Sequence, residues 1–117
     1  FMYLTEAIGD TPMVGALPGT CFDTGKLTRF GYVTLRAKSD NLLCRAGGGI
    51  AAHEFHHWDC TCPGDAFTAE KPTGRRWECA VSSGTLYAGY PHFHFYSNLD
   101  FLYSFYDACI KEKHRHD

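Results

Sequence analysis

The chain has 117 residues, enough for one domain, with 11 Lys and Arg against 13 Asp and Glu and a formal net charge of -2. Hydrophobic residues make up 44% and aromatic residues 15% of the sequence, which excludes an intrinsically disordered chain. The acidic balance argues against a nucleic-acid partner, and the longest apolar runs fall well short of the roughly 18 residues that span a bilayer. We therefore expect a cytoplasmic globular unit that binds neither nucleic acid nor membrane.

The first half of the chain predicts short elements separated by turn residues. A short helix is expected over Phe1–Ile8, because apolar residues recur there and Gly9 follows where helices often end. Strands are expected over Met13–Leu17 and over Arg29–Leu35, the second being rich in Tyr, Val and Thr. The segment Cys60–Gly74 predicts a loop, because Pro and Gly are frequent in it.

The remaining elements complete a single α/β unit. Residues Ile50–Trp58 form the next unit and carry a His cluster. The segments Arg76–Val81 and Thr85–Tyr90 are separated by Ser-Ser-Gly and predict a pair of strands. A final helix is expected over Leu99–Lys113, because its apolar residues recur close to every 3.6 positions and Ser97-Asn98 can cap its start.

Six cysteines and seven histidines are many for this length, so both residue types are candidates for chemistry. The cysteines are scattered at irregular intervals in a chain rich in aromatic residues, whereas disulfide frameworks are typical of smaller, loop-rich secreted chains. We therefore expect reduced thiols.

The first His cluster, His53-Glu54-Phe55-His56-His57, matches the H-E-x-x-H pattern of zinc metalloproteases. That pattern works on a helix, which places both His on one face with Glu as the base. Here three glycines precede the cluster and Cys-Thr-Cys-Pro-Gly follows it, so a long helix is not expected. On a strand, His53 and His57 would face one way, and Glu54 and His56 the other. A structural zinc site using the cluster with Cys60 and Cys62 stays open as an alternative, although C-x-C is not the usual C-x₂-C knuckle.

The second cluster runs Tyr-Pro-His-Phe-His-Phe-Tyr-Ser from position 90 to 97. On a strand, His92 and His94 would share one face. The cluster lies where a strand leads into the final helix, and α/β folds expose functional residues at such ends. Each His could instead be buried in an aromatic core, so both interpretations are kept.

The two clusters together resemble the family of cobyrinic acid a,c-diamide synthases. Ala-His-Glu-Phe-His-His at 52–57 and Gly-Tyr-Pro-His-Phe-His-Phe at 89–95 are similar to that family's G-H-E-F-H-Y-S and S-Y-L-H-L-H-F motifs, in the same order. The resemblance covers essentially all 117 residues. It implies that residues 1–117 are a C-terminal portion of a class I glutamine amidotransferase domain, an open, flavodoxin-like α/β fold. The corresponding domain of the synthase that amidates nickel sirohydrochlorin looks similar.

The resemblance also implies a mechanism and its residues. In the family, a Cys thiolate attacks glutamine and a His transfers protons. His92 matches that catalytic His, His94 matches the second His of the motif, and His53, Glu54 and His56 match the other motif, where they are expected to support or line the cleft. The family's nucleophile lies in a Glu-Cys-Gly-Gly run just ahead of the segment matching Phe1, so no cysteine of this sequence is expected to be the nucleophile.

The resemblance further implies glutamine as substrate, a corrin precursor as acceptor, and a synthetase domain of the same parent chain that receives ammonia and uses ATP and Mg²⁺. This chain is expected to hold no cofactor or metal of its own and to be inactive alone. Besides the zinc-binding or metallohydrolase alternative, a remnant that binds glutamine without hydrolysing it remains open.

Overall fold

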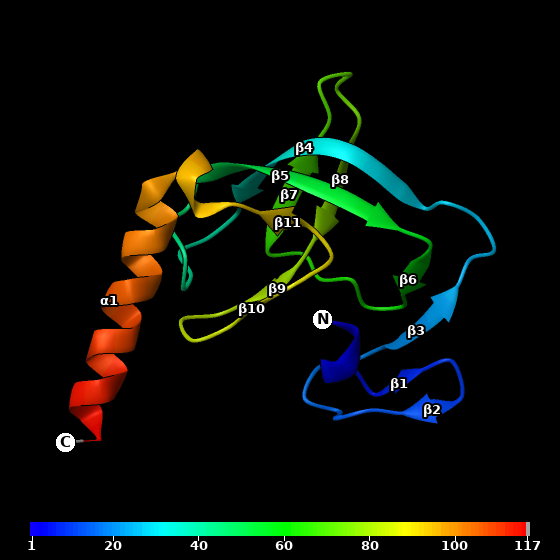
Figure 1. Cartoon of the computed structure of the whole chain (residues 1–117), viewed down its shortest axis with the longest axis horizontal. Helices are drawn as coiled ribbons and strands as arrows, with labels where there is room; N and C mark the ends of the chain where they lie inside the picture. Colours follow the sequence, from blue (N-terminus) through cyan, green and yellow to red (C-terminus); the bar gives the residue numbers. More distant parts are fainter. Residues whose placement is uncertain (117) are drawn as a thin grey trace.

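The computed structural model describes residues 1–116 and combines three sheets with one α-helix (Figure 1). The larger sheet has the strand order β11-β5-β4-β7-β8. Its strands are β4 (Arg29–Ala37), β5 (Gly49–His56), β7 (Phe67–Glu70), β8 (Arg76–Cys79) and β11 (His92–Phe93). All neighbouring pairs in this sheet are antiparallel.

A smaller sheet with the order β2-β1-β3-β6 lies beside the chain start. Its strands are β1 (Ala7–Ile8), β2 (Thr11–Pro12), β3 (Thr20–Asp23) and β6 (Trp58–Cys60), and β1 pairs with β3 in parallel. The strands β9 (Val81–Ser82) and β10 (Tyr87–Ala88) form a separate hairpin. The described structure is thus an α/β unit in which the β2-β1-β3-β6 sheet is mixed and the other two sheets are antiparallel.

The two larger sheets are connected at His57, between β5 and β6. The backbone carbonyl of His57 accepts hydrogen bonds from the hydroxyls of Thr24 (2.6 Å) and Thr28 (3.0 Å). These bonds hold the β3–β4 connection against the point where β5 leaves one sheet and β6 enters the other. The end of the His cluster is therefore fixed between two sheets.

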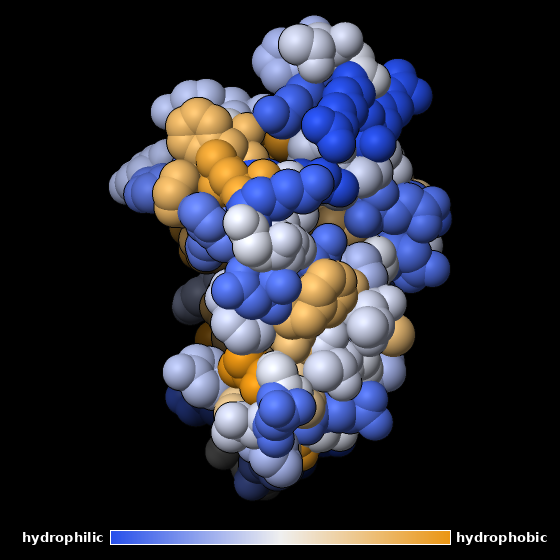
Figure 2. All heavy atoms as spheres, turned by 90° about the vertical axis from the view of Figure 1, so that its right-hand side faces the viewer, coloured by the Kyte–Doolittle hydropathy of each residue, from blue (hydrophilic) through white to orange (hydrophobic). Residues whose placement is uncertain are grey.

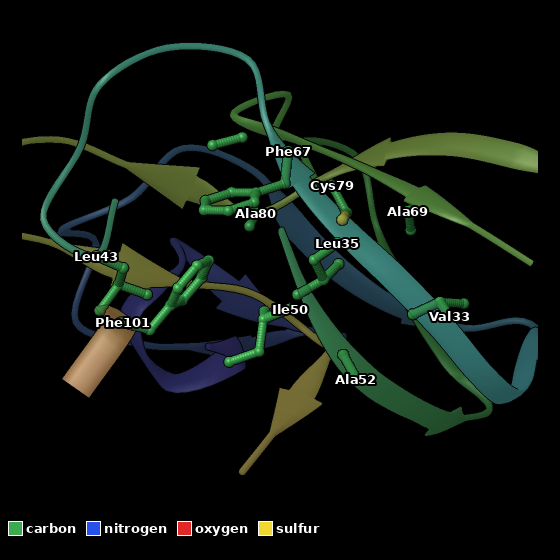
Figure 3. Packing of buried hydrophobic residues seen from close by; sticks show 11 residues of the cluster. Val33, Leu35, Leu43, Ile50, Ala52, Phe67, Ala69, Cys79, Ala80 and Phe101 are labelled. Atoms are coloured by element: carbon green, nitrogen blue, oxygen red, sulfur yellow. The ribbon is translucent and has the colours of Figure 1, made fainter. Parts of the chain in front are cut away.

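The hydrophobic core lies on one face of the larger sheet (Figure 3). Val33, Leu35 and Ala37 of β4 are buried, whereas the residues between them are exposed, as expected for a strand with one covered face. The 3-10 helix η2 (Phe95–Ser97) leads into the helix α1 (Leu99–Arg115), and Phe101 of α1 is fully buried in this core.

The start of α1 is tied to the sheet by its cap. Asn98 accepts a hydrogen bond from the backbone N–H of Asp100 at 3.1 Å, as an N-cap residue should, and its side-chain amide donates to the carbonyl of Gly49 at 2.8 Å. The predicted cap and helix are confirmed, and the helix runs two residues beyond the predicted Lys113. Within residues 1–116, neither α1 nor any other helix is long and apolar enough to cross a membrane.

The prediction of a helix over Phe1–Ile8 is wrong. Only Met2–Leu4 form a single 3-10 turn, η1, which ends where the Thr5 hydroxyl donates to the Met2 carbonyl at 2.6 Å. Ala7 and Ile8 pair with β3 instead, because ladder hydrogen bonds to a neighbouring strand outweigh a weak local helical preference. The expected strand Met13–Leu17 is also absent, since its backbone donates to the turn at Tyr3–Thr5 rather than to a strand.

The predicted loop Cys60–Gly74 contains β7, an interior strand of the larger sheet. Phe67 and Ala69 of this strand are fully buried, and β7 pairs with both β4 and β8. The Pro and Gly residues that suggested a loop flank the strand without interrupting it. The composition of the whole segment therefore concealed a four-residue strand.

The predicted strand pair Arg76–Val81 with Thr85–Tyr90 is divided between two sheets. Ala80 has a positive φ of 67°, which bends the chain so that β8 pairs with β7, while only β9 pairs with β10. Gly64 packs its backbone directly over Ala80, and a Cβ on Gly64 would lie 2.2 Å from the Ala80 carbonyl. This close approach requires glycine.

Candidate functional site

Strand β5 carries the first His cluster and divides it between two faces. His53 and Phe55 point to the exposed outer face of the sheet, whereas Glu54 and His56 point to the face that carries the core. Of the unit Ile50–Trp58, residues up to His56 lie in β5, whereas Trp58 begins β6 of the other sheet. The H-E-x-x-H pattern consequently lies on a strand, so it lacks the one-turn spacing of a zincin helix.

His92 lies directly opposite His53. The two residues are register partners in the antiparallel β11–β5 pair, and His53 is in turn the partner of Tyr32 on β4. Directly opposed side chains in such a pair have Cβ atoms about 4.5–5.5 Å apart on the same face. The structure thus brings together two of the predicted site residues, His92 and His53, and leaves His92 exposed.

Pro91 immediately precedes β11 and is buried. The sequence predicts that this proline requires an edge strand or a strand end, because it has no N–H to donate. This prediction is confirmed, since β11 begins at His92 and is the outermost strand of the larger sheet among the described residues.

Exposed aromatic rings surround His53 on the outer face. The His53 ring lies 5.3 Å from that of Tyr32 and 6.1 Å from that of Phe30, both in edge-to-face arrangements. Tyr32 is 77% exposed and Phe55 is 56% exposed. Seen from the side of β3, the surface in Figure 2 shows separate apolar patches interrupted by hydrophilic residues. His53 is thus set among aromatic rings that remain accessible.

His94 does not continue the strand. It is the N-cap of η2, where its Nδ1 accepts a hydrogen bond from the backbone N–H of Tyr96 at 3.2 Å and its ring stacks on Tyr96 at 5.3 Å. This bond requires an unprotonated Nδ1. The strand ends at Phe93, so His92 and His94 have different local roles rather than sharing a strand face.

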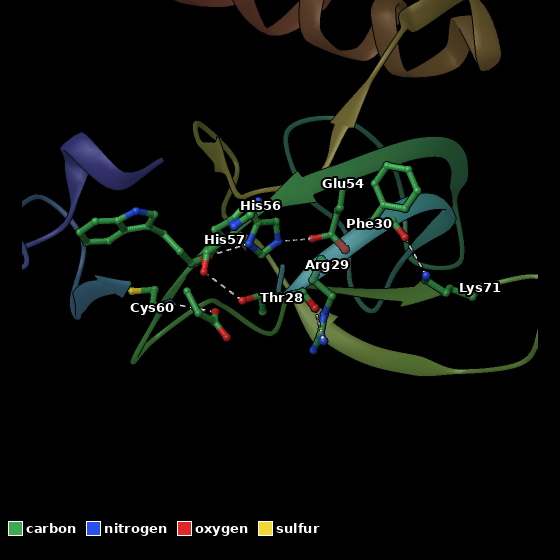
Figure 4. A network of polar contacts seen from close by, with 10 residues as sticks. Thr28, Arg29, Phe30, Glu54, His56, His57, Cys60 and Lys71 are labelled. Atoms are coloured by element: carbon green, nitrogen blue, oxygen red, sulfur yellow. Dashed lines mark hydrogen bonds and ion pairs between the residues drawn. The ribbon is translucent and has the colours of Figure 1, made fainter. Parts of the chain in front are cut away.

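Glu54 and His56 form a polar pair on the core face (Figure 4). Glu54 is only 2% exposed, its Oε1 lies 3.4 Å from His56 Nε2, and its Oε2 has no hydrogen-bond partner. His56 Nδ1 lies 2.6 Å from the carbonyl of Trp58, which can only accept, so Nδ1 carries a proton. Burial alone would lower the pKa of His56, but the bonds to Glu54 and to the Trp58 carbonyl outweigh burial and raise it.

Tyr90 completes this group and is a residue that the sequence did not single out. Its ring stacks on His56 with centroids 4.1 Å apart and planes 9° apart, and the Phe1 ring meets it edge-on at 5.1 Å. Burial also raises the pKa of the Tyr90 hydroxyl. The sequence feature that could have drawn attention to Tyr90 is its position two residues before His92. That position alone does not predict a stack with a residue of β5.

Three of the cysteines, Cys44, Cys60 and Cys79, have surroundings that disfavour an activated thiol. All six are free thiols. Burial raises the pKa of Cys60 to about 11 and that of Cys79 to about 12, and it also raises the pKa of Cys44. A catalytic thiol needs a lowered pKa, because the thiolate is the nucleophile.

A metal centre is not formed by the described residues. Within residues 1–116, no group of three or more His, Cys, Asp or Glu side chains could hold a metal ion. Cys60 is buried next to Cys21, its register partner in the smaller sheet, whereas His53 and His92 lie on the outer face of the larger sheet. The zinc alternative from the sequence therefore has no geometric support.

The fold and the paired histidines define an α/β segment that presents a His at a sheet edge, and similarity to known proteins identifies its family. The chain is 35% identical over 112 residues to the cobyrinate a,c-diamide synthase of Fusobacterium nucleatum, covering 87% of this chain and 24% of that protein. The synthase of Clostridium acetobutylicum is 34% identical over 106 residues, covering 86% of this chain and 24% of the relative. That of Priestia megaterium is 31% identical over 125 positions, covering all of this chain and 27% of the relative.

By sequence, the chain therefore belongs to the family of cobyrinate a,c-diamide synthases, which confirms the resemblance drawn from the two motifs. It spans about a quarter of the length of the curated relatives that it matches. No family model matches the chain.

Proposed function

We propose that this chain is part of an ATP-dependent, glutamine-hydrolysing ligase that amidates the a and c acetate side chains of cobyrinic acid in cobalamin biosynthesis, and that His92 is its glutaminase base. The observation that carries the proposal is the position of His92, exposed at the sheet edge and opposite a second His of the family motifs. The similarity to named synthases over most of the chain supports the reaction.

In this mechanism the nucleophile is a cysteine thiolate outside this sequence. The thiolate attacks the glutamine carboxamide and forms a thioester with release of ammonia, and water then hydrolyses the thioester to glutamate. His92 gives a proton to the leaving ammonia and takes one from the attacking water. Burial raises the pKa of Cys44, Cys60 and Cys79, which disfavours these three thiols as the nucleophile.

The other motif residues divide into two roles. His53 lies beside His92 on the outer face and is placed to line the cleft, while His94 orders the turn after β11 through its cap. Glu54 and His56 lie on the core face, so we assign them a supporting role rather than contact with glutamine.

The finer fold and the partners belong to the same proposal. Residues 1–117 would form a C-terminal portion of a flavodoxin-like class I amidotransferase domain, whose central parallel strands lie outside this sequence. ATP and Mg²⁺ would bind in a synthetase domain of the same parent, which receives the ammonia and acts on the corrin precursor. A cytoplasmic location and inactivity of this chain by itself stay predictions.

The test is glutamine hydrolysis by the full-length protein and its His92→Ala variant. We expect the variant to lose roughly 10²–10⁴-fold in kcat, the usual contribution of a general acid–base residue. His57→Ala is the matched control, because His57 is an exposed His of the same motif region and has no part in the proposed chemistry. Full activity in His92→Ala, or no hydrolysis by the wild-type protein, would overturn the proposal, and the latter result would favour a glutamine-binding remnant.

A further inference from the structure

We propose that Tyr90 is a positioning residue, held by the buried pair of Glu54 and His56, and that it sets where His92 stands relative to the nucleophile. This inference rests on the proposed glutaminase function. It gives a role to the buried Glu54 and to the stack of His56 on Tyr90, neither of which takes part directly in the proposed reaction.

The first step is the contact between β5 and Tyr90. The imidazole of His56 lies flat on the Tyr90 ring, with centroids 4.1 Å apart and planes 9° apart. His56 cannot turn away easily, because one ring nitrogen is bonded to the Trp58 carbonyl at 2.6 Å and the other faces Glu54 at 3.4 Å. Tyr90 therefore rests on a ring whose orientation is fixed at both nitrogens.

The second step is the short link from Tyr90 to His92. Pro91 lies between them, and its ring fixes its own φ and restricts the backbone of Tyr90 before it. Pro91 is buried, and His92 is bound to β5 as the register partner of His53. A displacement of Tyr90 is thus transmitted to His92 through one rigid residue.

The third step is the contact on the other side of Tyr90. The Phe1 ring meets the Tyr90 ring edge-on at 5.1 Å. In the family, the segment matching Phe1 follows the nucleophile turn. Under the proposed function, Tyr90 therefore contacts His56 on one side and, on the other, the segment next to the nucleophile. A single aromatic ring then contacts both the β5 side and the Phe1 side.

The buried carboxylate argues that this arrangement is not only packing. Glu54 is only 2% exposed, and its Oε2 has no hydrogen-bond partner. A buried ion pair is generally no more stabilising than apolar residues of similar size, although it can fix one arrangement of the chain. The contacts here indicate that Glu54 orients the His56 ring against the Tyr90 ring.

The experiment compares Tyr90→Leu with Tyr90→Phe in the full-length protein. Leucine removes the stack, whereas phenylalanine keeps the ring and removes only a hydroxyl that has no hydrogen-bond partner. A chloroketone analogue of glutamine, which alkylates the catalytic thiol, counts the folded sites, and kcat is then expressed per labelled site. Per-site counting separates positioning from a loss of folded protein.

We expect Tyr90→Leu to lower kcat per labelled site by about 10–100-fold, since a shift of about 1 Å in a catalytic group can cost that much, with the KM for glutamine nearly unchanged. Tyr90→Phe should restore the wild-type rate. Equal per-site rates in the leucine and phenylalanine variants would overturn the inference, provided that His92→Ala abolishes hydrolysis in the same assay. Retained hydrolysis in His92→Ala would instead overturn the proposed function, and the inference with it.

Discussion

The two faces of strand β5 carry the same residue types in different surroundings. On the outer face, His53 is partly exposed among accessible aromatic rings and stands opposite His92. On the core face, His56 is enclosed by Glu54, Tyr90 and the Trp58 carbonyl. One motif thus provides a histidine that solvent can reach and another whose ring nitrogens face groups of the protein. Alternation along a strand, rather than residue type, separates these roles.

The largest difference between the faces is expected for the two histidines. His56→Ala removes the partner of a buried carboxylate and should lower the free energy of unfolding by about 3–5 kcal/mol. His53→Ala, on the same strand but on the outer face, should change it by about 0.5 kcal/mol. Urea unfolding of the chain followed by circular dichroism measures both values.

The double variant Glu54→Gln with His56→Ala sharpens this test. It removes the unpaired charge, so it should recover part of the stability lost in His56→Ala. Similar losses for His53→Ala and His56→Ala would contradict the division of the strand into two faces.

A second comparison uses apolar residues of β5. Ile50 is buried in the core, and truncation to Ala should cost about 2–5 kcal/mol through lost burial and the cavity left behind. Phe55→Ala removes a larger side chain that is 56% exposed, and we expect a loss of about 1 kcal/mol or less, from its edge-to-face contact with Phe30. The midpoint and slope of denaturant curves give the difference. A larger loss for Phe55→Ala would mean that the outer face is covered.

The smallest expected effect is a pH dependence of the free energy of unfolding that arises from His56 on the core face. The folded-state pKa of His56 is raised, so its contribution to stability is complete below the unfolded-state pKa of about 6.5 and is lost as pH rises through the folded-state value. The groups facing the ring are Glu54, Tyr90 and Asp59. The difference in unfolding free energy between the wild type and His56→Gln should therefore decrease from pH 6 to pH 8.5. A difference that grows with pH would contradict the assigned hydrogen bonds.

Sequence patterns predicted the elements whose own residues carry a complete signal. The strand at Arg29–Leu35 is rich in Tyr, Val and Thr, and the helix beginning at Leu99 has a cap and a regular apolar face. Both are confirmed. The helix over Phe1–Ile8 and the loop over Cys60–Gly74 are wrong, because β1 and β7 are stabilised by partners far away in the chain. Local composition cannot report such partners.

The candidate site shows the same division. The motifs pointed to His92, His53, Glu54, His56 and His94, and the family followed from them. The sequence could not indicate that Tyr90 stacks on His56, since the two residues are distant in the chain and meet only when β11 pairs with β5. The catalytic role of His92 stays a prediction.

By itself the sequence determined the family, the alternation of the His cluster and the final helix, because motif order, strand periodicity and capping are properties of neighbouring residues. Tertiary structure alone decided that His92 faces His53, that Glu54 is buried against His56, and that Ala80 divides one predicted strand between two sheets. These features depend on strand register and on packing between distant segments, and their energies arise only after the chain has closed on itself.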